Sequence, residues 1–133
     1  MGGARGHDAP VASQAKTIVV GYDGTEGAQR ALEAAAQLIG YGSTLTVVSV
    51  GSGDAPEPQD VLAEARAWLL DRLVTATYIR RRGDAAGELV AAATELEADL
   101  VVVGRRGVDG EPAPGSVSVE IVRRADCDVL VVG

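Results

Sequence analysis

Two glycine-rich segments hold the residues best suited to bind a small anionic ligand. The first, residues 21–27, reads GYDGTEG and includes Asp23, whose carboxylate can accept hydrogen bonds from a ribose or a base. The second, residues 104–118, passes through Gly115 and Ser116 into an expected helix. Glycines let a backbone approach a ligand closely, and the N–H groups at a helix start attract anions. The second segment therefore predicts either an anion site or a surface loop that ends in a serine N-cap.

Residues that common catalytic sites require are missing from the sequence. The only histidine, His7, lies in a leader rich in glycine and alanine, and Lys16 is the only lysine. A phosphate-binding P-loop needs a Gly-Lys-Ser/Thr sequence, which the chain does not contain. The glycines of residues 21–27 are spaced GxxGxxG, whereas dinucleotide-binding proteins have GxGxxG. We therefore expect a protein that is not an enzyme, although slow hydrolysis of ATP stays compatible with the sequence.

The composition is that of one small domain. The chain has 133 residues, 47% of them hydrophobic, and it lacks phenylalanine, so its core must be aliphatic. A single cysteine excludes an internal disulfide framework. The net charge of −7 has the wrong sign for broad nucleic-acid binding, and no apolar run reaches the roughly 20 residues that cross a membrane. We expect a cytoplasmic protein, and the preference for arginine over lysine suggests a bacterial source.

Short aliphatic runs alternate with segments of helical periodicity after residue 15. Such continuous aliphatic runs are typical of strands that are covered on both faces, as in a parallel sheet. Parallel strands need crossover helices, so the alternation predicts a doubly wound α/β domain over residues 16–133, behind a mobile tail of residues 1–15. The expected strands are Ile18–Val20, Thr44–Val50, Thr75–Ile79, Leu100–Val103 and Val129–Val132.

Four helices are expected between these strands. Thr25 and Asp84 are suited to cap the first and third helices, and Gly40 is suited to terminate the first. Pro58 precedes the second helix, and the last runs from about residue 116 to residue 124. In doubly wound sheets, ligands bind outside the carboxyl ends of the strands, where the winding reverses. Both glycine-rich segments follow strands and are therefore expected at that edge.

Five motifs occur in a defined order along the domain: Gly21–Thr25, Arg82–Asp84, Ala98–Gly107, Gly115–Ser118 and Cys127–Val132. Together they resemble the universal stress protein family, over about residues 16–133. The resemblance implies a stress-response protein with a five-stranded, Rossmann-like parallel sheet in the order 3-2-1-4-5. It also implies a homodimer, as is usual in the family. An adenine nucleotide, ATP or AMP, is bound in one branch of the family and not in the other.

The resemblance further implies which residues would bind the nucleotide. Asp23 and the backbone of Val50 would hold the adenosine, and Gly104 would lie near the ribose. Magnesium is implied only if ATP is the ligand, and no other metal is expected. The residues that would meet the phosphates are Gly107, Gly115, Ser116, Val117 and Ser118.

The phosphate segment departs from the family pattern. The nucleotide-binding branch has nine residues before its Gly-Ser pair, whereas seven residues separate Gly107 from Gly115 here. Those seven include two prolines, which lack N–H donors, and two acids, which repel phosphate. This composition disfavours ATP more than AMP-like ligands. It also leaves open an alternative function, a nucleotide-free protein-interaction module with the same fold.

The last expected strand, Val129–Val132, would lie at a sheet edge in the family order. An uncovered apolar edge invites pairing with another chain, so we predict a homodimer in which the last strands of two copies pair. The arginines of residues 80–82 end the third expected strand and form either a phosphate contact or a solvated loop. Cys127 is flanked by two acids, which disfavour its thiolate and indicate a structural thiol.

Overall fold

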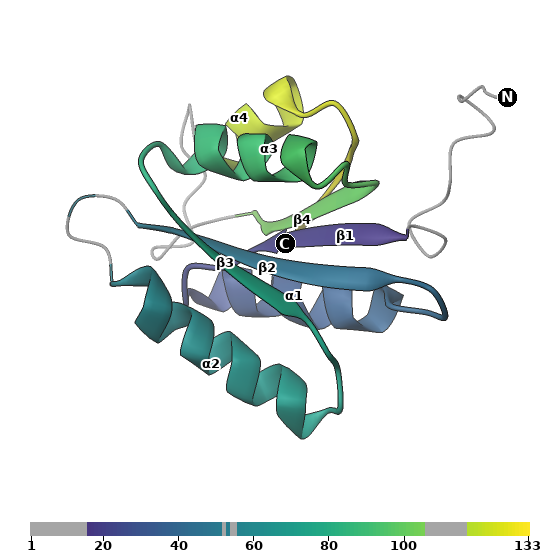
Figure 1. Cartoon of the computed structure of the whole chain (residues 1–133). Helices are drawn as coiled ribbons and strands as arrows, with labels where there is room; N and C mark the ends of the chain where they lie inside the picture. The colour runs from purple at the N-terminus through teal and green to yellow at the C-terminus, as the bar shows by residue number, and fades with distance from the viewer. Residues whose placement is uncertain (1–15, 52, 54–55, 106–116) are drawn as a thin grey trace, which may run out of the picture.

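The computed structural model describes residues 16–51, 53, 56–105 and 117–133 (Figure 1). The expected tail, residues 1–15, and the site residues Gly107, Gly115 and Ser116 lie outside this part of the chain. Strands and helices alternate as the sequence predicts. In chain order the elements are β1 (Thr17–Gly21), α1 (Glu26–Leu38), β2 (Thr44–Gly51), α2 (Pro58–Asp71), β3 (Thr77–Arg82), α3 (Ala85–Glu95), β4 (Leu100–Gly104), α4 (Val117–Arg124) and β5 (Asp128–Val132).

The five strands form one parallel sheet in the order β3-β2-β1-β4-β5, which confirms the predicted fold class and strand order. The helices α1 and α2 cover one face, and α3 and α4 cover the other (Figure 1). The winding reverses between β1 and β4, where Val20 pairs with Val102. This reversal is the position at which doubly wound sheets bind their ligands.

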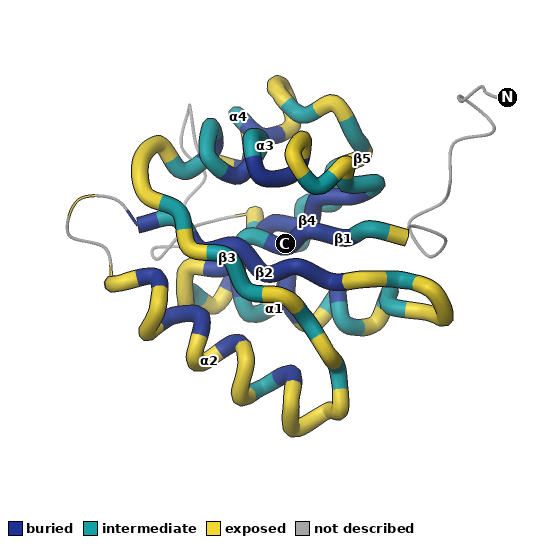
Figure 2. Tube along the Cα trace, viewed as in Figure 1, coloured by how far each residue is buried: buried dark blue, intermediate teal, exposed yellow. Residues whose placement is uncertain are grey.

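Burial on both faces explains the aliphatic strands. Ile18 and Val20 pack with α1 and α2, whereas Val19 packs with α3 and α4, and all three are fully buried. Figure 2 shows the contrast between the buried central strands and the more exposed outer surfaces of β3 and α2. The core is therefore divided into two aliphatic layers by the sheet itself.

The helix starts follow the predicted caps. The Thr25 hydroxyl accepts a hydrogen bond from the Ala28 amide at 3.2 Å, and the Asp84 carboxylate accepts one from the Gly87 amide at 2.8 Å. Both side chains satisfy amides that have no partner within the helix. Pro58 is the first residue of α2, where its missing N–H carries no penalty.

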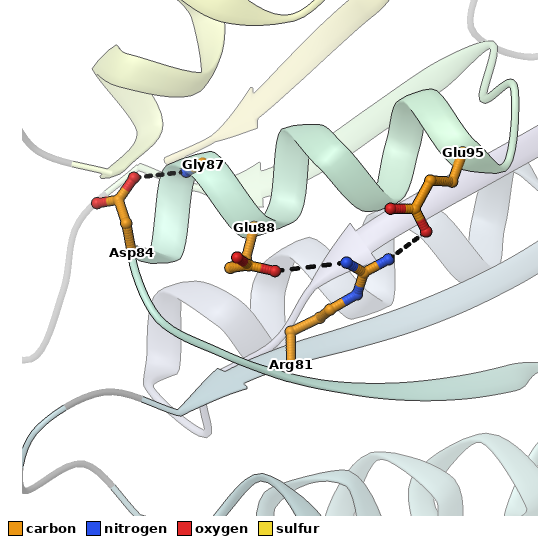
Figure 3. A network of polar contacts seen from close by, with 5 residues as sticks. All are labelled: Arg81, Asp84, Gly87, Glu88 and Glu95. Carbon is orange, nitrogen blue, oxygen red and sulfur yellow. Dashed lines mark hydrogen bonds and ion pairs between the residues drawn. The ribbon is translucent and has the colours of Figure 1, made fainter.

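Strand β3 lies later in the sequence than predicted, because its arginines belong to the sheet. The aliphatic pattern predicts a strand over Thr75–Ile79, but the strand runs from Thr77 to Arg82. Arg81 points to the α3 side of the sheet, where its guanidinium contacts Glu88 and Glu95 (Figure 3). These carboxylates on α3 neutralise a charge that sequence periodicity alone assigns to a loop.

Within the described part of the chain, no helix is both long enough and apolar enough to cross a membrane.

Candidate functional site

The carboxyl edge of the sheet brings together the candidate site residues that the structure describes. Asp23 follows β1, Val50 is the penultimate residue of β2, and Gly104 is the last residue of β4. Val117 and Ser118 are the first two residues of α4. Because all five strands run in the same direction, these positions lie on one edge of the sheet around the reversal between β1 and β4.

Asp23 has one carboxylate oxygen engaged and one open. Its Oδ1 accepts hydrogen bonds from the Thr25 amide at 3.0 Å and from the Thr25 hydroxyl at 2.6 Å. The Thr25 hydroxyl in turn caps α1, so Asp23 helps to fix the start of that helix. Its Oδ2 has no hydrogen bond to a described residue, and the side chain is exposed. Asp23 can therefore accept a further hydrogen bond without losing its structural role.

Val50 presents backbone groups beside the end of β1. Val48 accepts a hydrogen bond from the Tyr22 amide at 2.9 Å, so the peptide groups of Val48 face β1. Peptide direction alternates along a strand, so the N–H and C=O groups of Val50 also face the β1 side of β2. They lie beyond the last residue of β1. Among the described residues, neither the Val50 N–H nor its C=O has a backbone partner on that side. One donor and one acceptor are thus open at the crevice.

Gly104 is required by helix packing whether or not a ligand is present. A Cβ atom added at Gly104 would lie 2.5 Å from the carbonyl carbon of Gly27, and backbone cannot yield as a side chain can. The sequence suggested only the close approach of a ligand. The structure shows that α1 itself packs against β4 at this glycine, so Gly104 has a structural role as well.

Ser118 connects the start of α4 to the end of β4. Its side chain is buried, and the hydroxyl donates a hydrogen bond to the Arg105 carbonyl at 3.2 Å. The hydroxyl proton is therefore engaged within the protein, while the oxygen retains acceptor capacity. Val117, in contrast, is 45% exposed. Of the phosphate-segment residues named from the sequence, only Val117 and Ser118 are described.

The arginines that end β3 contact protein groups. Arg80 donates to the Gln59 amide oxygen at 3.1 Å, and Arg82 pairs with Glu57 at 2.8 Å. Arg81 has two carboxylate partners, and its hydrogen bond to Glu95 is the main cause that raises the pKa of this guanidinium. Strands β2 and β1 separate β3 from the reversal, so this run is better described as a structural edge than as a phosphate site.

Glu64, which no motif in the sequence marks, lies beside the first glycine-rich segment. Glu64 on α2 has its Oε1 atom 3.8 Å from the position of a Cβ at Gly24. Burial, followed by the negative charges of Glu64 and Asp23, raises the pKa of Tyr22, whose hydroxyl donates to Gln29 at 3.1 Å. No spacing rule relates Glu64 to residues 21–27, since only the packing of α2 brings them together. The β1 and α2 side of the crevice is consequently negative.

Cys127 lies just before β5, at the amino ends of the strands and thus opposite the candidate site. Its thiol is half-buried, and a hollow of about 150 Å³ next to it is lined by α3 residues including Val90 and Ala93. Burial, and then the charges of Asp128, Asp126 and Asp99, raise the pKa of this thiol. The half-buried position and the raised pKa agree with the interpretation of Cys127 as a structural thiol with a disfavoured thiolate. No group of three potential metal ligands occurs among the described residues.

The edge formed by β5 and α4 is apolar and partly exposed. The strand residues 129–132 are all of intermediate exposure. On α4, Ile121 is buried against the core, while Val119 and Val122 are 45% and 54% exposed. Helix α4 contacts β5 and carries these exposed valines, and β5 is the strand that the sequence assigns to a homodimer.

Comparison with known proteins identifies relatives over nearly the whole domain. A sequence profile of the universal stress protein family matches residues 14–133. The universal stress protein Rv1636 of Mycobacterium tuberculosis is 34% identical, over 88% of this chain and 95% of the relative. A universal stress protein of Thermus aquaticus is 32% identical, over 88% and 98%. The crystal structure of a universal stress protein in complex with cAMP superposes with a TM-score of 0.73 at 26% identity, covering 90% of this chain and 97% of that one.

Proposed function

The chain belongs to the universal stress protein family, and from this premise we propose that it is a cytoplasmic, homodimeric stress-response protein that binds an adenine nucleotide as a regulatory ligand. The observation that carries the proposal is the pair of open hydrogen-bonding positions at one crevice, the Oδ2 atom of Asp23 and the backbone of Val50. The cAMP bound to a structural relative supports the class of ligand.

The open groups match the chemistry of adenosine. Adenine presents a ring-nitrogen acceptor next to an amino donor, and one backbone N–H and one C=O, as at Val50, are complementary to such a pair. A ribose hydroxyl can donate a hydrogen bond to the open carboxylate oxygen of Asp23. Together these contacts would select an adenine nucleoside without a protein side chain that reads the base.

The charges of the crevice orient the ligand and limit its phosphate number. Asp23 and Glu64 make the β1 and α2 side negative, so the phosphate would lie toward β4, where Arg105 follows the strand. The segment beyond Arg105 includes Gly107, Gly115 and Ser116, outside the described residues, and its two acids disfavour additional phosphates. We therefore expect AMP or cAMP to bind more tightly than ATP, with magnesium needed only for ATP.

Helix α4 provides a route from the ligand to the dimer surface. Its first residues follow the phosphate segment, and its outer face carries Val119 and Val122 beside β5. A ligand that fixes the start of α4 would also fix this apolar face. Such a device needs no catalysis, and we propose that the nucleotide is bound rather than hydrolysed.

Isothermal titration calorimetry with AMP, cAMP and ATP tests the proposal. We expect binding of the monophosphates, and at least a tenfold weaker Kd after Asp23→Ala, because a charged hydrogen bond is lost. The Asp126→Ala variant is the matched control, since Asp126 is an exposed acid at the opposite edge of the sheet. No heat with any of the three nucleotides, or an equal loss in both variants, would refute nucleotide binding at this crevice.

One observation favours the alternative of a nucleotide-free interaction module. The Ser118 hydroxyl is already bonded to the Arg105 carbonyl, which closes the start of α4 onto β4 without a phosphate. In that case AMP should leave hydrogen exchange in α4 unchanged, whereas a regulatory nucleotide should slow it. Hydrogen-exchange mass spectrometry with and without AMP distinguishes the two functions.

A further inference from the structure

A second surface, far from β5, combines arginine, aromatic and exposed aliphatic side chains. We define the α2–β3 face as the outer stripe of α2, Leu73 just beyond the end of that helix, and the adjoining side of the edge strand β3. It lies on the side of the sheet covered by α1 and α2 (Figure 1), and its α2 residues are exposed (Figure 2). The face consists of Gln59, Arg66, Leu70, Leu73, Tyr78 and Arg80.

Contacts between the helix and the strand make this face continuous. The Arg66 guanidinium lies 5.9 Å from the centre of the Tyr78 ring, and Arg80 donates a hydrogen bond to Gln59. On α2, Arg66 and Leu70 are four residues apart and therefore share one side of the helix. Arginine and tyrosine are among the residues that contribute most to protein interfaces.

Two leucines on this face are exposed without a role in the core. Leu70 is 54% exposed and Leu73 is 93% exposed. Leu73 also has a φ of 61°, a left-handed conformation that favours glycine. Helix α3 is also followed by a residue in the left-handed conformation, Glu97, with a φ of 54°. This kind of helix ending therefore does not require an aliphatic side chain. A leucine at such a position, strained and exposed, is consistent with selection for a contact.

The charge of the face is opposite to that of the protein. The chain carries a net charge of −7, yet neither Arg66 nor Arg80 forms an ion pair within the described part of the chain. The carboxylate of Glu64, on the same helix, approaches Gly24 on the crevice side instead. Helix α2 thus separates its charges, and the basic side faces β3. Charge complementarity calls for an acidic partner.

The edge of β3 offers backbone groups in the same place. The Gly83 amide donates a hydrogen bond to the Gly51 carbonyl of β2. Because peptide direction alternates along a strand, the N–H and C=O groups of the odd-numbered residues of β3 face β2. The peptide groups of Tyr78 and Arg80 consequently face outward, and their side chains lie on the α2 side of the sheet. An added strand would bond to these groups and place alternate side chains against the α2–β3 face.

We propose that the α2–β3 face binds an extended segment of a partner protein in which every second residue, on the side that faces α2, is acidic or aliphatic. The carboxylates would pair with Arg66 and Arg80, and the aliphatic residues would cover Leu70 and Leu73. A second copy of the chain is a poor occupant, because pairing two β3 edges would bring their arginines together. The inference concerns a surface separate from the nucleotide crevice.

Fluorescence anisotropy with a labelled peptide of the repeating sequence Glu-Ser-Val-Ser, which places glutamate and valine on one side of a strand, tests the inference. The peptide of the repeating sequence Lys-Ser-Val-Ser is the control probe. We expect the acidic peptide to bind and the basic one not to bind, with weaker binding as salt is raised. Arg66→Glu and Arg80→Glu should each weaken the acidic peptide about tenfold. Lys16→Glu, the same charge reversal at an exposed residue near β1, should leave the affinity unchanged.

The Leu73→Gly variant separates a contact from a structural role. Glycine relieves the left-handed conformation, so we expect a higher melting temperature together with weaker peptide binding. Amide shifts in NMR spectra should map to β3 and α2. Equal affinity for both peptides, equal effects of Lys16→Glu and Arg80→Glu, or shifts confined to other elements would overturn the inference, whatever the result for nucleotide binding.

Discussion

The two edges of the sheet differ in how they meet solvent. Strand β5 presents the aliphatic residues 129–132, next to the exposed valines of α4. Strand β3 alternates Arg80 and Arg82 on one side of the sheet with Arg81 on the other. Open edges invite pairing, and charged side chains are a common means to prevent it. The comparison supports the proposed pairing of β5 with a like strand, whereas the arginines of β3 disfavour a like strand and suit an acidic one.

The largest expected effect is the loss of the dimer at β5. Because the Val132 carbonyl bonds to the Arg105 amide, the peptide groups of Val131 face outward. Val131→Pro should therefore remove an intersubunit donor without breaking the β4–β5 ladder, and light scattering should report the 13.6 kDa monomer at micromolar concentration. Arg80→Pro, at an outward position of β3, should leave the dimer mass unchanged.

A second variant keeps this prediction testable if the proline impairs folding. Val119→Glu with Val122→Glu places two charges on the exposed face of α4 and leaves the buried Ile121 in place. This variant should also be monomeric. A dimer that survives both changes would contradict the assignment of β5 and α4 as the dimer surface.

An intermediate effect is expected from the ion pairs that hold β3. Arg81 has 22% of its side chain exposed and contacts two carboxylates, whereas Arg82 is 61% exposed and contacts one. Arg81→Met should lower the free energy of unfolding by about 1 kcal/mol, and Arg82→Met by less, because exposed pairs contribute little. Urea denaturation measures both. Equal losses would show that the Arg81 contacts do not stabilise the edge more than a surface pair.

The smallest effect concerns the thiol just before β5. Burial and acidic neighbours raise the pKa of Cys127, so the folded protein holds the thiol proton more tightly than the unfolded chain does. The resulting stability is complete below the unfolded pKa, and it is lost as pH rises through the folded value. Above about pH 9, the wild type should lose stability more steeply than Cys127→Ala. Parallel pH profiles from pH 8 to 10 would contradict this.

The sequence predicts those parts of the fold that depend on local patterns. The aliphatic runs locate β1, β2, β4 and β5, and the side chains of Thr25 and Asp84 mark their helices because a cap bonds within three residues. The strand order follows from the family resemblance. Strand β3 is displaced because its register depends on contacts between Arg81 and a helix that comes later in the sequence.

In the candidate site, too, local features are predictable from the sequence and tertiary contacts are not. Asp23 and Gly104 are recognisable from motifs, but their structural partners are not. The bond from Asp23 to Thr25 is local, whereas the contact of Gly104 with Gly27 and the approach of Glu64 to Gly24 depend on how helices pack on the sheet. Sequence spacing carries no information on such tertiary contacts, so the negative side of the crevice emerges only from the structure.

Native mass spectrometry of the full chain with AMP tests the central claim most directly, since one spectrum reports both the assembly and its ligand. We predict a species of about twice 13.6 kDa that carries one AMP per subunit, and the same dimer without AMP for Asp23→Ala. A spectrum in which the wild type remains free of AMP at millimolar nucleotide would contradict the account.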